Sequence, residues 1–274
     1  MTQTLQLGLM VLSLPLLLGT AAFFLASFAG RRLGRTHGPD VERHLLRMLL
    51  LGLLVARLAF VVQFREAYLK APLGILDIRD GGWHASFGLG AAFAYGAVVL
   101  ALRAPLRKPL ALAAGIGVGA WLAGTLLLSA NAPEQVQMPK LALPSMDGRT
   151  IALASFEGRP TVVNLWATWC PPCQREMPML HAAQRSRPDV NFVFLNQGES
   201  AQQVAAYLGK SGLALRNVLL DGRGEAGAAL GHRALPTTLF FDSGGRLVDT
   251  RVGELSEATL ADRLASLPTA TTKK

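Results

Sequence analysis

Four long apolar stretches in the first half of the sequence constrain its fold more than any other feature. They cover residues 5–29, 48–64, 83–102 and 109–130 and contain almost no charged side chains. Each is about long enough to cross the ~30 Å hydrocarbon core of a bilayer as a helix. The sequence therefore predicts an α-helical transmembrane anchor domain over residues 1–130, with four spans in the lipid bilayer.

The first stretch differs from a cleavable signal peptide. Residues 1–10 contain no Lys or Arg, and the apolar run is longer than the core of roughly 7–15 residues that a signal peptide carries. We therefore expect the first span to stay attached to the chain.

The distribution of positive charge indicates how the spans are oriented. The net charge is +9, and the segments 31–47 and 103–108 between spans are rich in arginine. Because basic residues beside membrane helices are retained in the cytoplasm, we expect both segments on that side of a bacterial inner membrane. The loop 65–82 and everything after residue 130 then lie in the periplasm, where disulfides persist. Basic residues form no stripe interleaved with aromatic residues, so nucleic acid is not an expected partner.

Two polar residues in the anchor need an explanation. Arg57 lies in the middle of the second stretch, where a charge is costly enough to indicate either a function or an internal partner. Snorkelling or a structural hydrogen bond is the simpler alternative. His84 begins the third stretch without another His or carboxylate at metal-ligand spacing, which favours an interfacial residue over a metal ligand.

Part of the anchor resembles the prolipoprotein diacylglyceryl transferase family. The similarity covers about residues 48–100 and rests on ARLAFV at 56–61 and YLKAPLGILDIRDGG at 68–82. It implies a lipid-handling membrane fold with a histidine after the paired glycines and a later Gly-Arg-Asn signature. Here Ser86 occupies the comparable position, His84 is offset by two, and the signature is missing. The sequence thus indicates an anchor or docking surface.

The second half, after a linker at 131–135, has the pattern of an α/β domain over residues 136–268. A hairpin is predicted from 141–143 and 150–153 around Asp147-Gly148. The β-branched strand 161–167 leads into helix 174–187, and two strand-helix units follow at 190–196 with 200–210 and at 217–220 with 225–230. Such alternation favours a parallel core. A closing hairpin (236–242 and 247–252) and helix 256–267 complete a central mixed sheet, and the tail 269–274 is expected to be disordered.

The two cysteines of the chain stand where the first long strand meets its helix. Cys170 and Cys173 flank two prolines, and residues three apart on a first helical turn are roughly 5–6 Å apart, which suits a disulfide. A helix N-terminus also favours the thiolate that attacks a disulfide, and Pro171 suits the first turn. Zinc binding and a purely structural disulfide are the alternatives. The chain lacks further ligands for zinc, and so short a loop would gain little stability from a crosslink. We expect a redox pair.

The segment VVNLWATWCPPCQREMP at 162–178 resembles the membrane-attached TlpA/ResA-like branch of the thioredoxin superfamily. The resemblance extends over essentially all of the second half and implies a thioredoxin-like domain. It also implies that Cys170 is the exposed nucleophile and Cys173 the buried resolving thiol. Glu176 matches an acidic residue beneath the pair that moves protons to or from Cys173, the alternative being a solvated helix residue.

The same resemblance implies roles for residues around the cysteine pair. Pro178 corresponds to the proline that kinks the active-site helix. Leu235 and Pro236 correspond to the loop bearing a cis-proline against which an extended client segment pairs, although a trans proline that begins a strand is the alternative. The predicted substrate contacts are Trp169, Pro171, Pro172, Leu235 and Pro236. Trp166 is expected in the core, and the loop 196–199 is expected at the surface or beside the groove.

These features together predict a membrane-anchored protein-disulfide reductase. Cys170 attacks a client disulfide, Cys173 resolves the mixed disulfide, and no metal or cofactor is expected besides the pair itself. The resemblance implies a membrane electron-transfer partner of the DsbD/CcdA kind, and clients that are secreted proteins or proteins of cytochrome or metal maturation. An oxidase or isomerase is the alternative within redox chemistry. A lipid-modifying transferase or a non-catalytic docking module is the alternative outside it.

Overall fold

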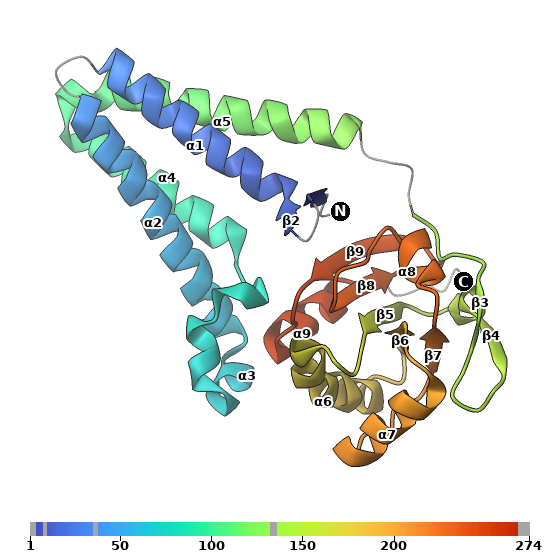
Figure 1. The fold of residues 1–274 in the computed structure, drawn as a ribbon. Helices are drawn as coiled ribbons and strands as arrows, with labels where there is room; N and C mark the ends of the chain where they lie inside the picture. The colour runs from blue at the N-terminus through green and yellow to red at the C-terminus, as the bar shows by residue number, and fades with distance from the viewer. Residues whose placement is uncertain (1–3, 8–9, 35–37, 132–135, 268–274) are drawn as a thin grey trace, which may run out of the picture. The chain divides into compact units, whose positions relative to one another are not determined.

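A computed structural model describes residues 4–7, 10–34, 38–131 and 136–267. The chain divides into two compact units (Figure 1). The helical unit consists of Gln3–Leu76 and Gly82–Ala132, and the α/β unit holds Asp77–Gly81 and the described part of Pro133–Lys274. The predicted linker, apart from Asn131, and the predicted tail lie outside the described residues.

The helical unit contains four helices that are long and apolar enough to cross a membrane, as predicted. These are α1 (Leu14–Leu33), α2 (Gly38–Gln63), α4 (Ala85–Leu102) and α5 (Arg107–Ala130). Short elements join them: α3 (Arg65–Lys70), η2 (Pro72–Leu76) and η4 (Ala104–Leu106). The connection between α2 and α4 also includes η3 (Ile78–Asp80), which belongs to the α/β unit.

Two helix boundaries differ from the sequence prediction. The first helix begins at Leu14 and not near residue 5, because β1 (Thr4–Leu7) and β2 (Met10–Ser13) pair as an antiparallel hairpin. Pro15 suits the first turn of the helix that follows. The second helix begins ten residues before the predicted 48, because its first turns carry charged side chains that an apolar run does not include.

Small residues allow close packing in the helical unit. Helix α1 packs against α5, and α2 packs against α4. A Cβ atom added to Gly88 of α4 would lie 2.6 Å from the carbonyl oxygen of Gly52 in α2, so only glycine permits this approach.

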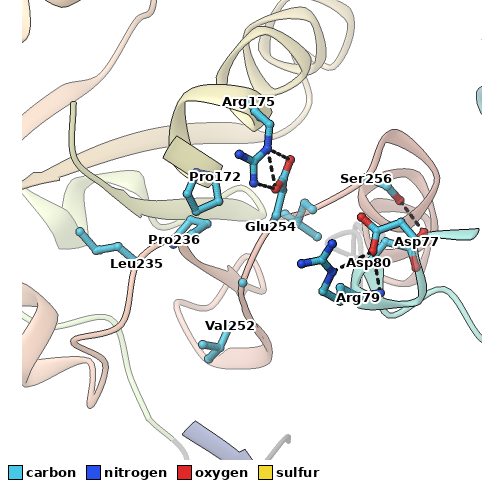
Figure 2. Close-up of a pocket in the computed structure, with 12 residues that line it drawn as sticks. Asp77, Arg79, Asp80, Pro172, Arg175, Leu235, Pro236, Val252, Glu254 and Ser256 are labelled. Carbon is cyan, nitrogen blue, oxygen red and sulfur yellow. Dashed lines mark hydrogen bonds and ion pairs between the residues drawn. The ribbon is translucent and has the colours of Figure 1, made fainter. Parts of the chain in front are cut away.

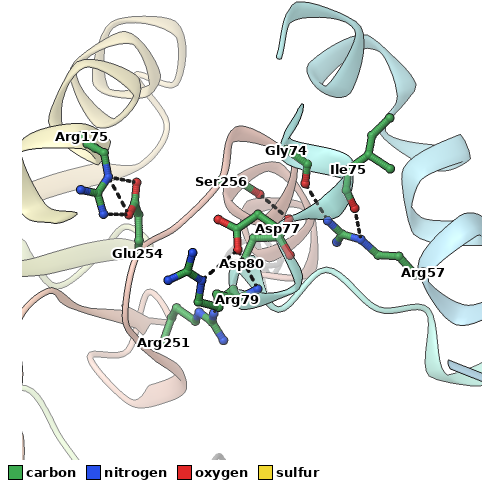
Figure 3. Close-up of polar contacts among 10 residues, drawn as sticks. All are labelled: Arg57, Gly74, Ile75, Asp77, Arg79, Asp80, Arg175, Arg251, Glu254 and Ser256. Carbon is green, nitrogen blue, oxygen red and sulfur yellow. Dashed lines mark hydrogen bonds and ion pairs between the residues drawn. The ribbon is translucent and has the colours of Figure 1, made fainter. Parts of the chain in front are cut away.

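Arg57 has internal partners in this unit. Its side chain is buried, and the guanidinium donates hydrogen bonds to the carbonyl oxygens of Gly74 (2.9 Å), Ile75 (3.2 Å) and Gly82 (2.9 Å), two of them drawn in Figure 3. These contacts favour the structural interpretation of Arg57. His84 precedes α4, and its Nε2 lies 2.6 Å from Gln63 Oε1.

The α/β unit is built on one five-stranded mixed sheet in the order β7-β6-β5-β8-β9. Strands β5, β6 and β7 run parallel, and β8 and β9 are antiparallel to their neighbours. Their bounds are β5 (Thr161–Trp166), β6 (Asn191–Gln197), β7 (Val218–Asp221), β8 (Thr237–Phe241) and β9 (Leu247–Val252). A separate hairpin joins β3 (Ala142–Pro144) to β4 (Thr150–Ala152). The remaining elements are η5 (Leu153–Phe156), α6 (Pro171–Ser186), α7 (Ala201–Ser211), α8 (Glu225–Ala229) and α9 (Glu257–Ser266).

Alternation along the strands produces two apolar layers, one on each face of the sheet. Val162 and Phe192 belong to one cluster with residues of α6, α7 and α9. Their neighbours Val163 and Val193 belong to the other cluster, with residues of β3, η5 and α8. Because both faces are covered, β5 is buried along its whole length.

The register of β5 and β8 determines where the cysteines lie. The two strands are antiparallel, and Leu165 near the end of β5 pairs with Thr237 at the start of β8. The residues that follow β5 and those that precede β8 therefore lie at the same end of the sheet, where β5 ends and β8 begins. These are the segment leading to Cys170 and the segment ending at Pro236.

Candidate active site

Cys170 and Cys173 form a disulfide just after the end of β5. Their Cα atoms are 5.3 Å apart, within the range expected from their spacing. Cys170 is the N-cap of α6, and the Cys173 N–H points at its sulfur at 3.3 Å. A thiolate at Cys170 would therefore face backbone N–H groups at the positive end of a helix, an arrangement that stabilises negative charge.

The exposure of Cys170 differs from what the family resemblance implied, whereas the burial of Cys173 agrees with it. In the disulfide form Cys170 is only 3% exposed, and Cys173 is fully buried. The sulfur of Cys170 is bonded to that of Cys173, and both belong to the same buried cluster, so the predicted nucleophile is covered in this state. Pro171 occupies the first turn of α6 and is exposed, and Pro178 lies inside the helix, where it cannot donate the usual bond to Gln174.

Glu176 lies on α6 one turn after Cys173 and is only 1% exposed, which argues against the solvated alternative. Its carboxylate accepts hydrogen bonds from Asn164 Nδ2 (2.8 Å) and from the Leu255 N–H (3.0 Å). Burial raises the pKa of Glu176 to about 7, against the opposing effect of these two hydrogen bonds. A carboxyl group with this pKa can both accept and release a proton near neutral pH.

The peptide bond between Leu235 and Pro236 is cis, as the resemblance implied. Pro236 is buried, Leu235 is half-buried, and both line a pocket with Pro172 from α6 (Figure 2). Trp169, just before the pair, is 67% exposed, whereas Trp166 is fully buried. An exposed aromatic ring next to Cys170 in the sequence offers apolar contact to a segment of another protein.

The sequence analysis missed the part that Glu199 plays. This residue is buried, and its carboxylate accepts hydrogen bonds from the Thr168 N–H (2.7 Å), the Thr168 hydroxyl and Asn196 Nδ2 (2.7 Å). The 196–199 loop, predicted at the surface or beside the groove, thus anchors the turn before Cys170. No local pattern indicated this role, since the partners lie 31 residues apart.

Two further polar contacts were also missed. Asn164 in β5 bonds both Glu176 and Thr238 of the adjacent strand. An asparagine within the apolar strand 161–167 was the one signal that could have identified it. Arg175 forms an ion pair with Glu254. The two residues lie 79 positions apart, and no local sequence pattern indicates that they pair.

The described residues contain no cluster of three or more His, Cys, Asp or Glu that could hold a metal ion. The site itself contains a disulfide at a helix N-terminus, which can open to a dithiol, and a carboxyl group with a pKa of about 7 one turn further along the helix.

Comparisons with known proteins match about half of this chain. The redoxin family model matches residues 133–265. The thiol-disulfide oxidoreductase ResA of Halalkalibacterium halodurans is 30% identical over 123 residues, which are 44% of this chain and 69% of that protein. The thioredoxin-like protein YneN of Bacillus subtilis is 28% identical over 165 residues, 53% of this chain and 96% of that protein.

The thiol:disulfide interchange protein DsbE of Vibrio cholerae is 29% identical over 143 residues, 52% of this chain and 74% of that protein. A solved structure of a secreted Mycobacterium tuberculosis disulfide oxidoreductase, described as homologous to E. coli DsbE, has 25% identity. It covers 47% of this chain and 96% of its own, with a TM-score of 0.43. The similarity of residues 48–100 to diacylglyceryl transferases stays a prediction.

Proposed function

This chain belongs to the redoxin family and is a thiol-disulfide oxidoreductase, and from that premise we propose that it reduces disulfides of client proteins outside the cytoplasm, with Cys170 as nucleophile. The observation that carries the proposal is the Cys170–Cys173 disulfide at the start of α6, where Pro172 lines a pocket with Pro236 and the buried carboxyl group of Glu176 lies one turn after Cys173. The comparisons favour neither a lipid-modifying transferase nor a non-catalytic docking module.

The reaction proceeds in two exchanges. The Cys170 thiolate attacks one sulfur of the client disulfide, forms a bond to it and releases the other client sulfur as a thiolate that takes up a proton. Cys173 then loses its proton and attacks Cys170, which forms the Cys170–Cys173 disulfide and releases the second client sulfur as a thiolate that takes up a proton. Two electrons pass from the pair to the client. Glu176, one turn after Cys173, is the group proposed to take that proton, since its pKa of about 7 suits the transfer.

Client binding is assigned to the surface around the pair. Trp169, Pro171 and Pro172 supply apolar contacts, and the segment of Leu235 and Pro236 presents backbone groups to an extended client chain. Proteins of cytochrome or metal maturation are the proposed clients. The names of the relatives support thiol-disulfide exchange and do not identify the client.

The oxidised pair then needs a source of electrons. We assign this role to a membrane partner of the DsbD/CcdA kind, which would donate two electrons through its own dithiol. The four apolar helices contain no cysteine and cannot supply them. They support a multi-pass position in the inner membrane, with the α/β unit in the periplasm as the arginine-rich segments indicate.

The direct test is to trap the mixed disulfide. Cys173→Ala should accumulate Cys170-linked adducts with client proteins in cells, because the resolving thiol is missing, whereas Cys170→Ala should not. Adducts are measured on non-reducing gels, with loss of the bands on reduction as the control. Equal trapping by both variants would show that the roles of the two cysteines are assigned wrongly.

A further inference from the structure

The loop that follows β9, residues 253–255, contacts three separate parts of the active site. The Gly253 N–H donates to the carbonyl oxygen of cis-Pro236 at 2.9 Å. The Leu255 N–H donates to Glu176 Oε2 at 3.0 Å, and the Glu254 carboxylate pairs with Arg175. Gly253 has a φ of +95°, a conformation that a side chain would strain. Three consecutive residues thus connect the cis-proline segment, the buried carboxyl group and the active-site helix.

The contact between Arg175 and Glu254 has the geometry of a two-point clamp. Arg175 Nε lies 3.0 Å from Glu254 Oε2, and Nη2 lies 2.5 Å from the same oxygen, with Nε also 3.1 Å from Oε1 (Figure 3). Both side chains are substantially exposed, so the pair contributes little to overall stability. A planar guanidinium held at more than one point does, however, restrict the orientation of its partner.

Each residue of the ion pair immediately precedes one residue of the hydrogen bond between Leu255 and Glu176. Arg175 precedes Glu176 on α6, and Glu254 precedes Leu255, which donates to Glu176. The ion pair therefore joins the two backbone segments beside the hydrogen bond that the buried carboxylate accepts. If the ion pair opened, the 253–255 loop would keep the Gly253 bond to Pro236, the Leu255 bond to Glu176 and the packing of the buried Leu255 side chain, but it would lose its side-chain contact with Arg175 on α6.

We propose that Arg175 and Glu254 are positioning residues of the exchange reaction, whose ion pair holds the 253–255 loop against α6 so that Leu255 keeps its hydrogen bond to Glu176. The inference rests on the proposed function, because it concerns the proton that Cys173 gives up and regains. When Cys173 passes its proton to Glu176, the S–H bond breaks and an O–H bond forms, and the N–H of Leu255 stabilises the carboxylate before that transfer.

Three further groups affect the pKa of Glu176. Asn164 donates to Oε1 from β5, the charge of Glu254 disfavours the carboxylate, and the charge of Arg251 on β9 favours it. Removing the Leu255 hydrogen bond should therefore raise the pKa of Glu176. Neutralising Arg175 should act in the same direction, because it also leaves the charge of Glu254 uncompensated.

The test uses the oxidised full chain in detergent micelles, with ¹³C in the glutamate carboxyl groups, so that it needs no turnover. The signal of Glu176 is assigned as the one that Glu176→Gln removes, and its titration is followed by NMR. In Arg175→Gln the midpoint should rise by at least about 0.5 pH unit, and the Leu255 amide should exchange with solvent about tenfold faster. Arg187→Gln is the matched control, because Arg187 forms an exposed two-point ion pair with Asp189 just after the far end of α6.

Arg175→Lys separates orientation from charge, since lysine keeps the charge without the planar fork. We expect it to raise the midpoint and speed Leu255 exchange as Arg175→Gln does. A midpoint equal to that of the wild type in either variant, or an equal rise in Arg187→Gln, would overturn the clamp. Because the titration does not depend on activity, a failure here is distinct from a failure of the proposed reductase function, which the trapping experiment reports.

Discussion

Glu176→Gln should remove a pH dependence of folding stability that the buried carboxyl group imposes. The pKa of Glu176 in the fold is about 7, against an ordinary value of 4.5. The folded state therefore holds the proton more tightly than the unfolded state, and stability is greatest below pH 4.5 and is lost as the pH rises through 7. A difference of this size corresponds to about 3 kcal/mol in the free energy of unfolding.

Glutamine has nearly the same shape and its carbonyl oxygen can still accept a hydrogen bond from Leu255, but it carries no charge at any pH. We expect the variant to match the wild type near pH 4.5 and to exceed it by about 3 kcal/mol above pH 8, after both are oxidised. Urea titrations of the full chain in micelles would measure this. The signal is fluorescence of the buried Trp166, with the other tryptophans replaced by phenylalanine.

The exposed residue Glu157 supplies the control, because Glu157→Gln alters a carboxyl group of the same unit outside the active site. Its stability should follow that of the wild type across the pH range. If the wild type and Glu176→Gln kept a constant difference between pH 4.5 and 8, burial would not be raising the pKa of Glu176, and its proposed role in proton transfer would lose its basis.

Two predictions concern other parts of the molecule. Glu199→Ala should lower the free energy of unfolding by about 2 kcal/mol, because the Thr168 N–H and the Asn196 amide lose their acceptor. The variant should also reduce insulin more slowly. An unchanged midpoint of urea unfolding would refute the prediction. A membrane-impermeant maleimide should label Cys170 in reduced, intact spheroplasts, because the α/β unit is proposed to face the periplasm. Labelling only after lysis would place it in the cytoplasm.

Local patterns predicted most elements of the α/β unit within one to three residues. The strand predicted at 161–167 is β5 (Thr161–Trp166), and the strand predicted at 247–252 has the same bounds in β9. Period-two alternation and turn residues act over a few positions, which explains this agreement. The predicted start of the first apolar helix was wrong, because composition alone did not distinguish the β1–β2 hairpin from the helix that follows it.

The cysteine pair was predictable because its chemistry lies within four consecutive residues. Glu176 and Pro236 were expected from the family resemblance. The hydrogen-bond partners of Glu176 were not, since Asn164 lies 12 residues and Leu255 79 residues away from it in the sequence. Which polar side chain reaches which partner depends on strand order and on where each loop leaves the sheet. Those are properties of the assembled fold, and a single sequence does not display them.

The direct pairing of β5 with β8 means that the spacing between Cys170 and Pro236 is set across a single strand interface. The two strands that deliver Cys170 and Pro236 are neighbours, whereas α7 and β7 attach through β6 at the opposite edge. Lengthening of the connection from α7 to β7 would therefore leave this strand pairing unchanged, as long as Glu199 before α7 keeps its bonds to Thr168. A slip of one residue between β5 and β8 would instead misplace the proline against the sulfurs. We therefore expect the edge strand β7 to tolerate more sequence change than the central β5–β8 pair.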